Sequence, residues 1–262
     1  MSETQAHEGV GARLPRQEGG GARLPRKEDD RLMRGRGQFI ADIRMTGMQD
    51  VAFVRSPLAH ARIRGIHVPD DLKDRVFTAA DLDGVKPIRA VSGLPGFKVS
   101  EQPVLATGKV RQVGELIAMC VADTRAEAED MAARVELDLE ELPALHDMLE
   151  ARKPGAPLVH EHWGDNVFLE SLVNINIEAA FDAPVKVSRT ISTARQCMAP
   201  IEGRGAVIHF DHRCDQLVVH TASQMPHIVR SGLSECLQME EGQIRIISPD
   251  VGGGFGYKAM LL

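Results

Sequence analysis

The sequence lacks any apolar run that could cross a membrane. Its longest such stretch, "LIAMCVA" from Leu116 to Ala122, is far shorter than the roughly 20 residues that a spanning helix needs. The first residues, "MSETQAHEGVGARLPRQ", also lack the apolar segment of a secretory signal. We therefore expect no membrane span and a cytoplasmic location.

Metal and disulfide motifs are missing as well. The chain has four cysteines, which are widely spaced and form no C-x-x-C pair. This spacing predicts reduced thiols rather than a disulfide framework, and it gives no iron–sulfur or zinc motif on this chain. The net charge of −6 further argues against a general nucleic-acid-binding protein. The cysteines are Cys120, Cys197, Cys214 and Cys236.

The amino-terminal residues 1–30 differ in composition from the rest of the chain. They are rich in glycine, arginine and glutamate, and they nearly repeat themselves: "GARLPRQE" stands at 11–18 and "GARLPRKE" at 21–28. A unit this short cannot form a repeat fold. We expect a flexible arm, and the alternative is an arm that lies across a partner subunit.

Folded structure is expected from residue 31, beginning with a compact α+β domain that reaches residue 145. The strands are predicted at 50–56, 61–68, 114–122 and 135–142. A helix is predicted between the last two strands, because Thr124 and Glu127 form a capping-box pattern ahead of an alanine-rich stretch. Proline, glycine and histidine then accumulate, which predicts a linker at 146–165.

A second unit is expected from residue 166 to the end of the chain. The stretch 205–221 reads as a hairpin around "DHRCD", and 225–239 reads as a helix with Pro226 in its first turn. The strand predicted at 243–248 leads directly into a glycine-rich loop, "SPDVGGGFGYKA".

This loop does not match the nucleotide-binding motifs. In a P-loop, lysine directly follows the last glycine, but here Tyr257 separates Gly256 from Lys258, and Ala259 stands where serine or threonine would hold magnesium. In a dinucleotide fingerprint the third glycine would fall on Tyr257. The alternatives are an ordinary tight loop, or bare backbone that presents N–H groups to an anionic or oxo ligand.

Gln224 stands just before the predicted helix. Its amide offers both a donor and an acceptor, which suits an oxo or hydroxo group on a cofactor. In a helix-then-strand arrangement, the start of the helix and the end of the next strand come to the same rim, so Gln224 and Phe255 are expected to lie near each other. The alternative is that Gln224 only caps the helix, although Ser223 would be the better cap.

Other residues with metal-binding or nucleophilic side chains give weaker evidence for a functional site. Two of the four metal-capable residues at 209–220 fall in a predicted turn, so surface turn residues are favoured over a metal site. Cys197 has no base paired with it in the sequence, so a buried thiol is expected. The motif "HEHW" at 160–163 lacks the spacing of a zinc helix. The four metal-capable residues are His209, His212, Cys214 and His220.

Several segments, in order along the chain, resemble the molybdenum-binding large subunit of the xanthine dehydrogenase, aldehyde oxidoreductase and aerobic carbon monoxide dehydrogenase family. The resemblance implies a hammerhead-like α/β domain followed by the start of a molybdopterin-binding α+β domain. The segments are "RLMRGRGQFIADI", "AFVRSPLAHARI", "VRQVGELIAMCVADTRAEAEDMA", "MAPIEGRGAVIHFD", "TASQMPHIVR" and "SPDVGGGFGYKA".

The resemblance also implies a cofactor site. The cofactor would be a molybdenum-bearing molybdopterin, expected in its cytosine dinucleotide form. Gln224 and Phe255 would lie near the molybdenum without ligating it, and Gly253, Gly254 and Gly256 would contact the cofactor. The implied chemistry is hydroxylation of an electrophilic carbon, of N-heteroaromatic or aldehyde type, with water as the source of oxygen.

Two departures from the family pattern shape these expectations. The general-base glutamate of the family lies near the end of a longer subunit, so the site is expected to be completed by a second molybdenum-binding chain, the chain being a split or truncated subunit. Electrons would leave through [2Fe–2S] and FAD on partner subunits. Ala259 replaces the substrate-binding glutamate of purine-oxidising members, and Tyr257 is a second candidate for the substrate pocket. The alternative is a non-catalytic scaffold fragment.

Overall fold

The computed structural model describes residues 26–172 and 181–259. The chain divides into two units, Met1–Gln38 and Phe39–Leu262. In the first unit the described part contains the short helix α1 (Asp29–Met33). The predicted arm lies mostly outside the described residues, as does the end of the chain at 260–262.

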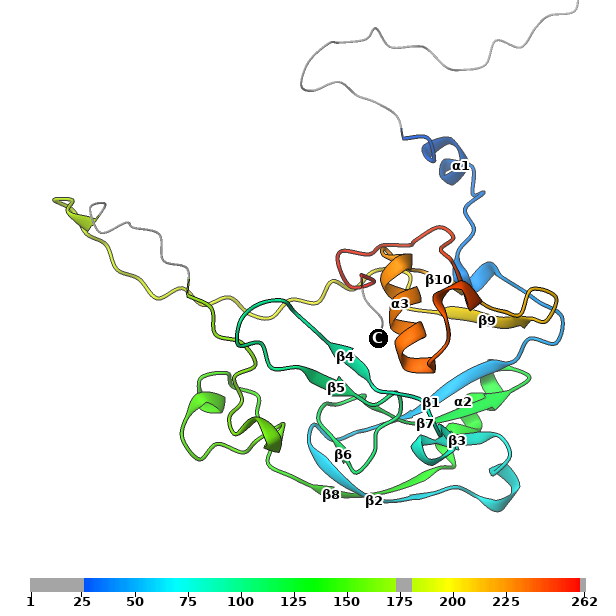
Figure 1. The fold of residues 1–262 in the computed structure, drawn as a ribbon, viewed down its shortest axis with the longest axis horizontal. Helices are drawn as coiled ribbons and strands as arrows, with labels where there is room; N and C mark the ends of the chain where they lie inside the picture. The colour runs from blue at the N-terminus through cyan, green and yellow to red at the C-terminus, as the bar shows by residue number, and fades with distance from the viewer. Residues whose placement is uncertain (1–25, 173–180, 260–262) are drawn as a thin grey trace, which may run out of the picture. The chain divides into compact units, whose positions relative to one another are not determined.

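The first sheet of the second unit has the order β1 (Asp50–Arg55), β7 (Leu116–Ala122) and β3 (Val76–Thr78), all antiparallel. Helix α2 (Arg125–Ala133) packs on β1 and β7 (Figure 1). The predicted capping box is confirmed, because the Thr124 side chain accepts from the Glu127 amide and the Glu127 carboxylate accepts from the Thr124 amide.

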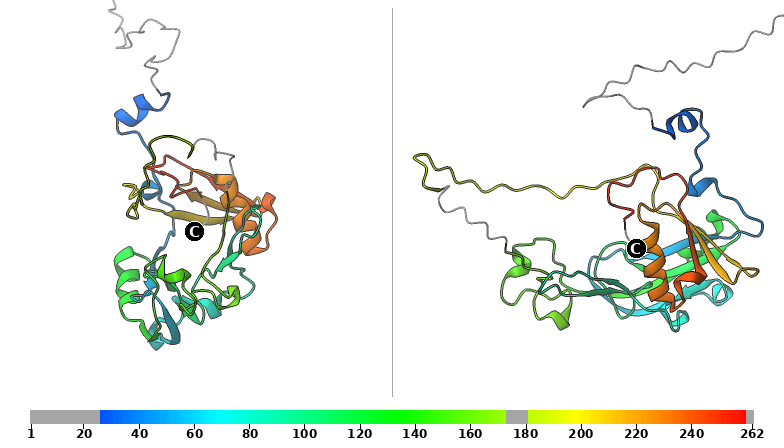
Figure 2. Two further views of the ribbon diagram at one scale, coloured as in Figure 1. Left: turned by 90° about the vertical axis from the view of Figure 1, so that its left-hand side faces the viewer. Right: turned by 45° about the horizontal axis from the view of Figure 1, so that its top comes forward.

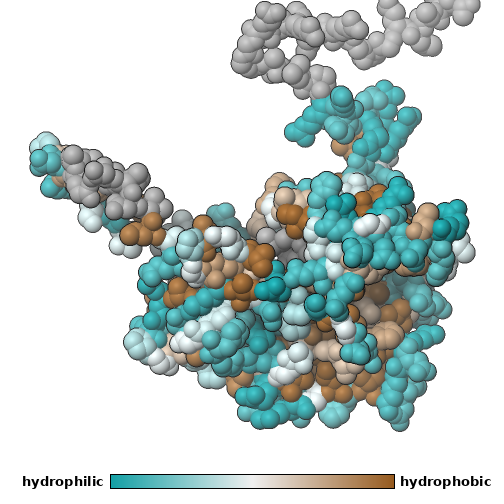
Figure 3. Space-filling view, in the orientation of Figure 1, coloured by the Kyte–Doolittle hydropathy of each residue, from teal (hydrophilic) through white to brown (hydrophobic). Residues whose placement is uncertain are grey.

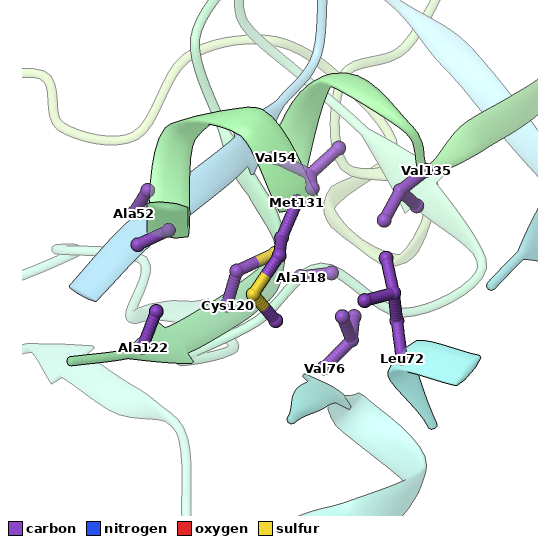
Figure 4. Close-up of a cluster of buried hydrophobic side chains, with 10 residues drawn as sticks. Ala52, Val54, Leu72, Val76, Ala118, Cys120, Ala122, Met131 and Val135 are labelled. Carbon is purple, nitrogen blue, oxygen red and sulfur yellow. The ribbon is translucent and has the colours of Figure 1, made fainter. Parts of the chain in front are cut away.

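The core of this layer consists of small and medium-sized apolar side chains from the sheet and from α2. In Figure 4 the Met131 side chain of α2 lies against Ala118 and Cys120 of β7. Burial raises the pKa of the Cys120 thiol, which suits an inert packing role. The cluster contains Ala52, Val54, Leu72, Val76, Ala118, Cys120, Ala122, Ala128, Met131 and Val135.

A second sheet has the order β6 (Lys109–Val110), β2 (Ala61–His67) and β8 (Glu136–Glu141). Strands β4 (Ile88–Ala90) and β5 (Ser100–Gln102) form a separate antiparallel pair. Among the longer strands, β8 was predicted from its alternation and β7 from its continuous apolar run. The short strands β4, β5 and β6 were not predicted, because a pattern needs several residues to show its period. Single turns of 3₁₀ helix lie at Ile40–Asp42, Asp70–Leu72, Ala79–Asp81, Glu150–Arg152, Glu161–Trp163 and Glu241–Gln243.

The stretch predicted as a linker is anchored on the second sheet. The Lys109 side chain is only 9% exposed, and its ammonium donates to the Glu161 carboxylate at 2.6 Å and to the Val159 carbonyl at 3.1 Å. The hydrogen bond from Lys109 lowers the pKa of Glu161 to about 2. Two 3₁₀ turns add local order to this stretch.

This anchor gives a pH-dependent prediction. Because the folded pKa of Glu161 is lowered from 4.5 to about 2, its contribution to stability is present above about pH 4.5 and is lost as the pH falls toward 2. Glu161→Gln should therefore lower the free energy of unfolding at neutral pH, by no more than about 1 kcal/mol because the side chain is largely exposed. The difference from wild type should shrink on acidification.

Urea denaturation at several pH values measures this difference. The matched control is Glu150→Gln in the same stretch, which breaks an exposed pair with Lys153 and should change little. A difference between Glu161→Gln and wild type that stays constant down to about pH 2 would contradict the assignment.

The third sheet has the order β11 (Ile244–Ile247), β10 (Gln216–Thr221) and β9 (Ala206–Asp211). The predicted hairpin is confirmed by the antiparallel pairing of β9 with β10, and β11 pairs with β10 in parallel. Helix α3 (Pro226–Leu237) connects β10 to β11 and packs beside β11, as Figure 2 shows in both views. No helix in the described part of the chain is long and apolar enough to span a membrane.

The segment that precedes this sheet, residues 182–205, contains no helix or strand. We call it the linking segment. Several of its apolar side chains are largely exposed, and Figure 3 shows such hydrophobic side chains reaching the surface. The expectation that Cys197 is buried is wrong, because this thiol is exposed in the linking segment. The exposed apolar residues are Val185, Val187, Ile191, Met198 and Ile201.

Candidate active site at the glycine loop

The glycine loop, residues 248–259, leaves the end of β11 at the edge of the sheet where β10 also ends. Gln224 lies between β10 and α3 at this same edge. The parallel pairing of β10 with β11 explains this meeting, because parallel strands deliver their carboxyl ends to one side of a sheet. The predicted proximity of Gln224 and the loop is thus confirmed.

The Gln224 amide packs directly on the loop backbone. Its Oε1 accepts from the Gly256 amide at 3.0 Å and from the Lys258 amide at 3.4 Å. A Cβ atom on Gly254 would lie only 2.5 Å from Gln224 Cδ. Only glycine permits this close approach. Gln224 does not cap α3, because the helix begins after Met225 and no side chain caps it there.

The tip of the loop is held in unusual backbone conformations. Gly253, Phe255 and Gly256 have φ values of 100°, 51° and 85°. A positive φ is costly for phenylalanine, by about 1–3 kcal/mol, and such strain collects at functional sites. Phe255 is 72% exposed. Within the described part of the chain, the amides of Gly253, Gly254 and Phe255 have no acceptor.

A buried ion pair that sequence reasoning missed lies beneath the loop. The Lys258 ammonium donates to Glu202 Oε2 at 2.8 Å, with the two side chains 0% and 16% exposed. Burial alone would raise the pKa of Glu202, but hydrogen bonds from Lys258, Gly252 and Ile40 outweigh burial and lower it. Glu202 therefore stays ionised. Only the distance between the two residues in the fold reveals this pair, since nothing in their sequence spacing links them.

Tyr257 points toward Arg204 of the linking segment. The Arg204 guanidinium lies over the phenol ring at 4.4 Å and donates to its hydroxyl at 2.9 Å. Ala259 lies at the end of the loop and is partly buried. Both substrate-pocket candidates therefore belong to the last part of the loop, with Tyr257 held in place by a cation–π contact.

The residues considered for a metal site do not form one. His209 and His220 stack with ring centroids 5.9 Å apart, and burial, with the neighbouring His209, lowers the pKa of His220. Cys214 is exposed. Among residues 26–172 and 181–259 no group of three or more metal-binding side chains gathers. In "HEHW", His160 stacks on Trp163 at 4.3 Å, which indicates packing.

The donors at the loop fit a pterin cofactor that carries an oxygen-bearing metal. Three successive backbone amides have no acceptor among the described residues. Gln224 is exposed, and its Nε2 group has no partner among the described residues. Such donors suit oxo and phosphate oxygens.

Two family models match the chain and together cover most of its folded part. The hammerhead domain of aldehyde oxidase and xanthine dehydrogenase matches residues 34–143. The molybdopterin cofactor-binding domain matches residues 159–262. The second match contains Gln224 and the whole glycine loop.

Known proteins of this kind are similar along most of the chain. The nicotine 6-hydroxylase large subunit of Paenarthrobacter nicotinovorans is 37% identical over 257 residues, covering 95% of this chain and 30% of that subunit. The carbon monoxide dehydrogenase large chain of Hydrogenophaga pseudoflava is 34% identical, covering 88% of this chain and 31% of its own. The chain thus spans about 30% of the length of these relatives.

The crystal structure of quinoline 2-oxidoreductase from Pseudomonas putida 86 superposes with a TM-score of 0.82 at 38% identity, covering 90% of this chain and 31% of that chain. The chain therefore belongs to the xanthine dehydrogenase, aldehyde oxidoreductase and carbon monoxide dehydrogenase family, in which it corresponds to the amino-terminal part of the molybdenum-binding large subunit.

Proposed function

We propose that this chain forms one wall of the cofactor site in a cytoplasmic, multi-chain molybdenum hydroxylase that oxidises an electrophilic carbon. The observation that carries the proposal is the meeting of Gln224 with a strained glycine loop whose amides at Gly253, Gly254 and Phe255 lack acceptors. When bound, a molybdenum pterin supplies the two-electron acceptor and a site for water-derived oxygen.

The residues of this chain bind and orient that group. Gln224 offers its Nε2 donor to an oxygen ligand of the molybdenum, while its Oε1 stays engaged by the loop. Gly253, Gly254 and Gly256 leave the backbone open to the cofactor. The exposed Phe255 ring covers the opposite side and keeps water away from it.

Other polypeptide must supply the rest of the site. The exposed apolar side chains of the linking segment support this, since alternating apolar residues of an extended stretch are normally buried against a sheet. We infer that a second molybdenum-binding stretch covers them and contributes the general-base glutamate. An iron–sulfur subunit and an FAD subunit would take up the electrons, and the pterin would be the cytosine dinucleotide form.

The substrate that we propose is an N-heteroaromatic ring, with an aldehyde as the other class. Two of the similar proteins are named for nicotine and quinoline, and both compounds are N-heteroaromatic. The flat Arg204–Tyr257 stack beside the loop offers a planar surface to such a ring. Ala259, which carries no charge, does not favour a purine.

Two substitutions of Gln224 separate its donor from its acceptor. Gln224→Glu keeps an acceptor for the Gly256 amide but removes the Nε2 donor, so the loop should stay in place while activity falls by about a hundredfold, as for lost donors at other reacting centres. Gln224→Ala removes both groups and should also release the loop.

The measurements are molybdenum content and substrate turnover in the complex purified through this chain. The control is Gln102→Glu in β5, an exposed position whose side chain makes no hydrogen bond in the described part of the chain, and it should leave both unchanged. An active complex that contains no molybdenum would refute the proposal. An assembled complex with neither molybdenum nor activity would indicate a scaffold instead.

A further inference from the structure

One carboxylate outside the glycine loop holds both ends of the loop. Glu202 Oε2 accepts from the Gly252 amide at 2.8 Å and from the Lys258 ammonium at 2.8 Å. The Glu202 amide in turn donates to the Gly252 carbonyl at 3.1 Å. We call these three residues the Glu202 clamp. The strained tip of the loop lies between its two attachment points.

Lys258 connects the clamp to Gln224. Its backbone carbonyl accepts from the Gln224 amide at 2.9 Å and from the Ser223 hydroxyl at 3.3 Å. Its own amide donates to Gln224 Oε1 at 3.4 Å. The residue whose side chain enters the clamp is thus the residue whose backbone holds Gln224, so a shift of Lys258 must shift Gln224.

Burial of the ion pair restricts the positions that the loop can adopt. The Lys258 side chain is fully buried, and within the described part of the chain its ammonium has Glu202 as its partner. A buried charge that loses its partner is strongly unfavourable, so other loop positions that separate the pair are disfavoured. Glu202 Oε1 also accepts from the Ile40 amide at 3.3 Å, which fixes the carboxylate itself against the segment ahead of β1.

We propose that Glu202 and Lys258 are positioning residues that fix the glycine loop against Gln224, and thereby set where the molybdenum pterin is held. This inference rests on the proposed function and deepens it. Neither side chain needs to touch the cofactor, because both act through the backbone of Gly252 and Lys258 and through Gln224.

The test is hydrogen exchange of the purified complex, followed by mass spectrometry, together with its molybdenum content. Lys258→Met keeps the apolar length of the side chain and removes the charge. The amides of Gly252, Gly256 and Lys258 should then exchange at least about tenfold faster, because hydrogen bonds to charged groups that hold the loop are lost. Amides of β9 and β10 should not change, and molybdenum content should fall.

Glu202→Gln keeps one acceptor oxygen but removes the charge that pairs with the Lys258 ammonium. The loop amides should again exchange faster while those of β9 and β10 do not, which maintains the test if Lys258→Met does not assemble. The matched control is Arg230→Met, which breaks the Arg230–Glu241 pair at 2.9 Å in the same unit and should leave the loop amides unchanged. Wild-type exchange at the loop in both clamp variants, or equal acceleration in β9 and β10, would overturn the inference. A wild-type complex without molybdenum would instead overturn the proposed function.

Discussion

Gly254→Ala should separate the glycine loop from Gln224 and greatly reduce molybdenum binding. The added Cβ would lie 2.5 Å from Gln224 Cδ and 2.6 Å from Gln224 Oε1, far inside any tolerated contact. The collision is with the side chain to which we assign the molybdenum-facing donor. Overpacking of this kind costs about 1–3 kcal/mol, and relief requires either Gln224 or the loop to move.

Two other glycines serve as controls for this substitution. Gly203→Ala places its Cβ where nothing lies within 4 Å, so it should leave molybdenum content and stability nearly unchanged. Gly256→Ala also meets no atom, but its φ of 85° strains an alanine, so it separates backbone strain from collision. Metal analysis and thermal unfolding of the three variants measure the effect. Full molybdenum content in Gly254→Ala would show that contact with Gln224 does not position the cofactor.

The elements that the sequence predicts well are those with a local cause. The capping box of Thr124 and Glu127 and the first-turn position of Pro226 depend on neighbours within one helical turn, and both are present. Strand β8 shows its alternation over six residues, and β7 is a run of seven apolar residues. Such elements can be predicted from one sequence because they depend on neighbouring residues and not on contacts with distant parts of the chain.

The features that the sequence does not predict depend on long-range contacts. The pair of Glu202 and Lys258 forms only when the linking segment passes beneath the glycine loop, and neither residue stands out where it occurs. The exposure of Cys197 has the same origin, because an apolar thiol is expected inside unless its segment lacks a sheet to join. The nearness of Gln224 to the loop is expected from the order of helix and strand, whereas its place near the molybdenum is what the family resemblance implies.

The linking segment carries the alternation of a strand without a partner strand in the described structure. Val185, Val187 and Ile191 are 77%, 79% and 86% exposed, and they share one face of an extended stretch with a single charged residue, Arg189. A stretch of this composition favours a pleated, half-buried setting. We therefore propose that it pairs with the polypeptide that supplies the rest of the large subunit, with its apolar side chains facing that partner.

Val187→Asp should then prevent this association while leaving the chain's own fold intact. In the chain itself the side chain is exposed, so the free energy of unfolding should change by less than about 0.5 kcal/mol. In the assembly a buried valine contributes about 1.5–3 kcal/mol, and an unpaired carboxylate adds a penalty, so affinity should fall by well over about tenfold. Ser188→Asp, on the opposite face of an extended stretch, is the matched control. Native mass spectrometry of the co-expressed proteins gives the assembled fraction, and equal assembly of the two variants would rule out burial of this face.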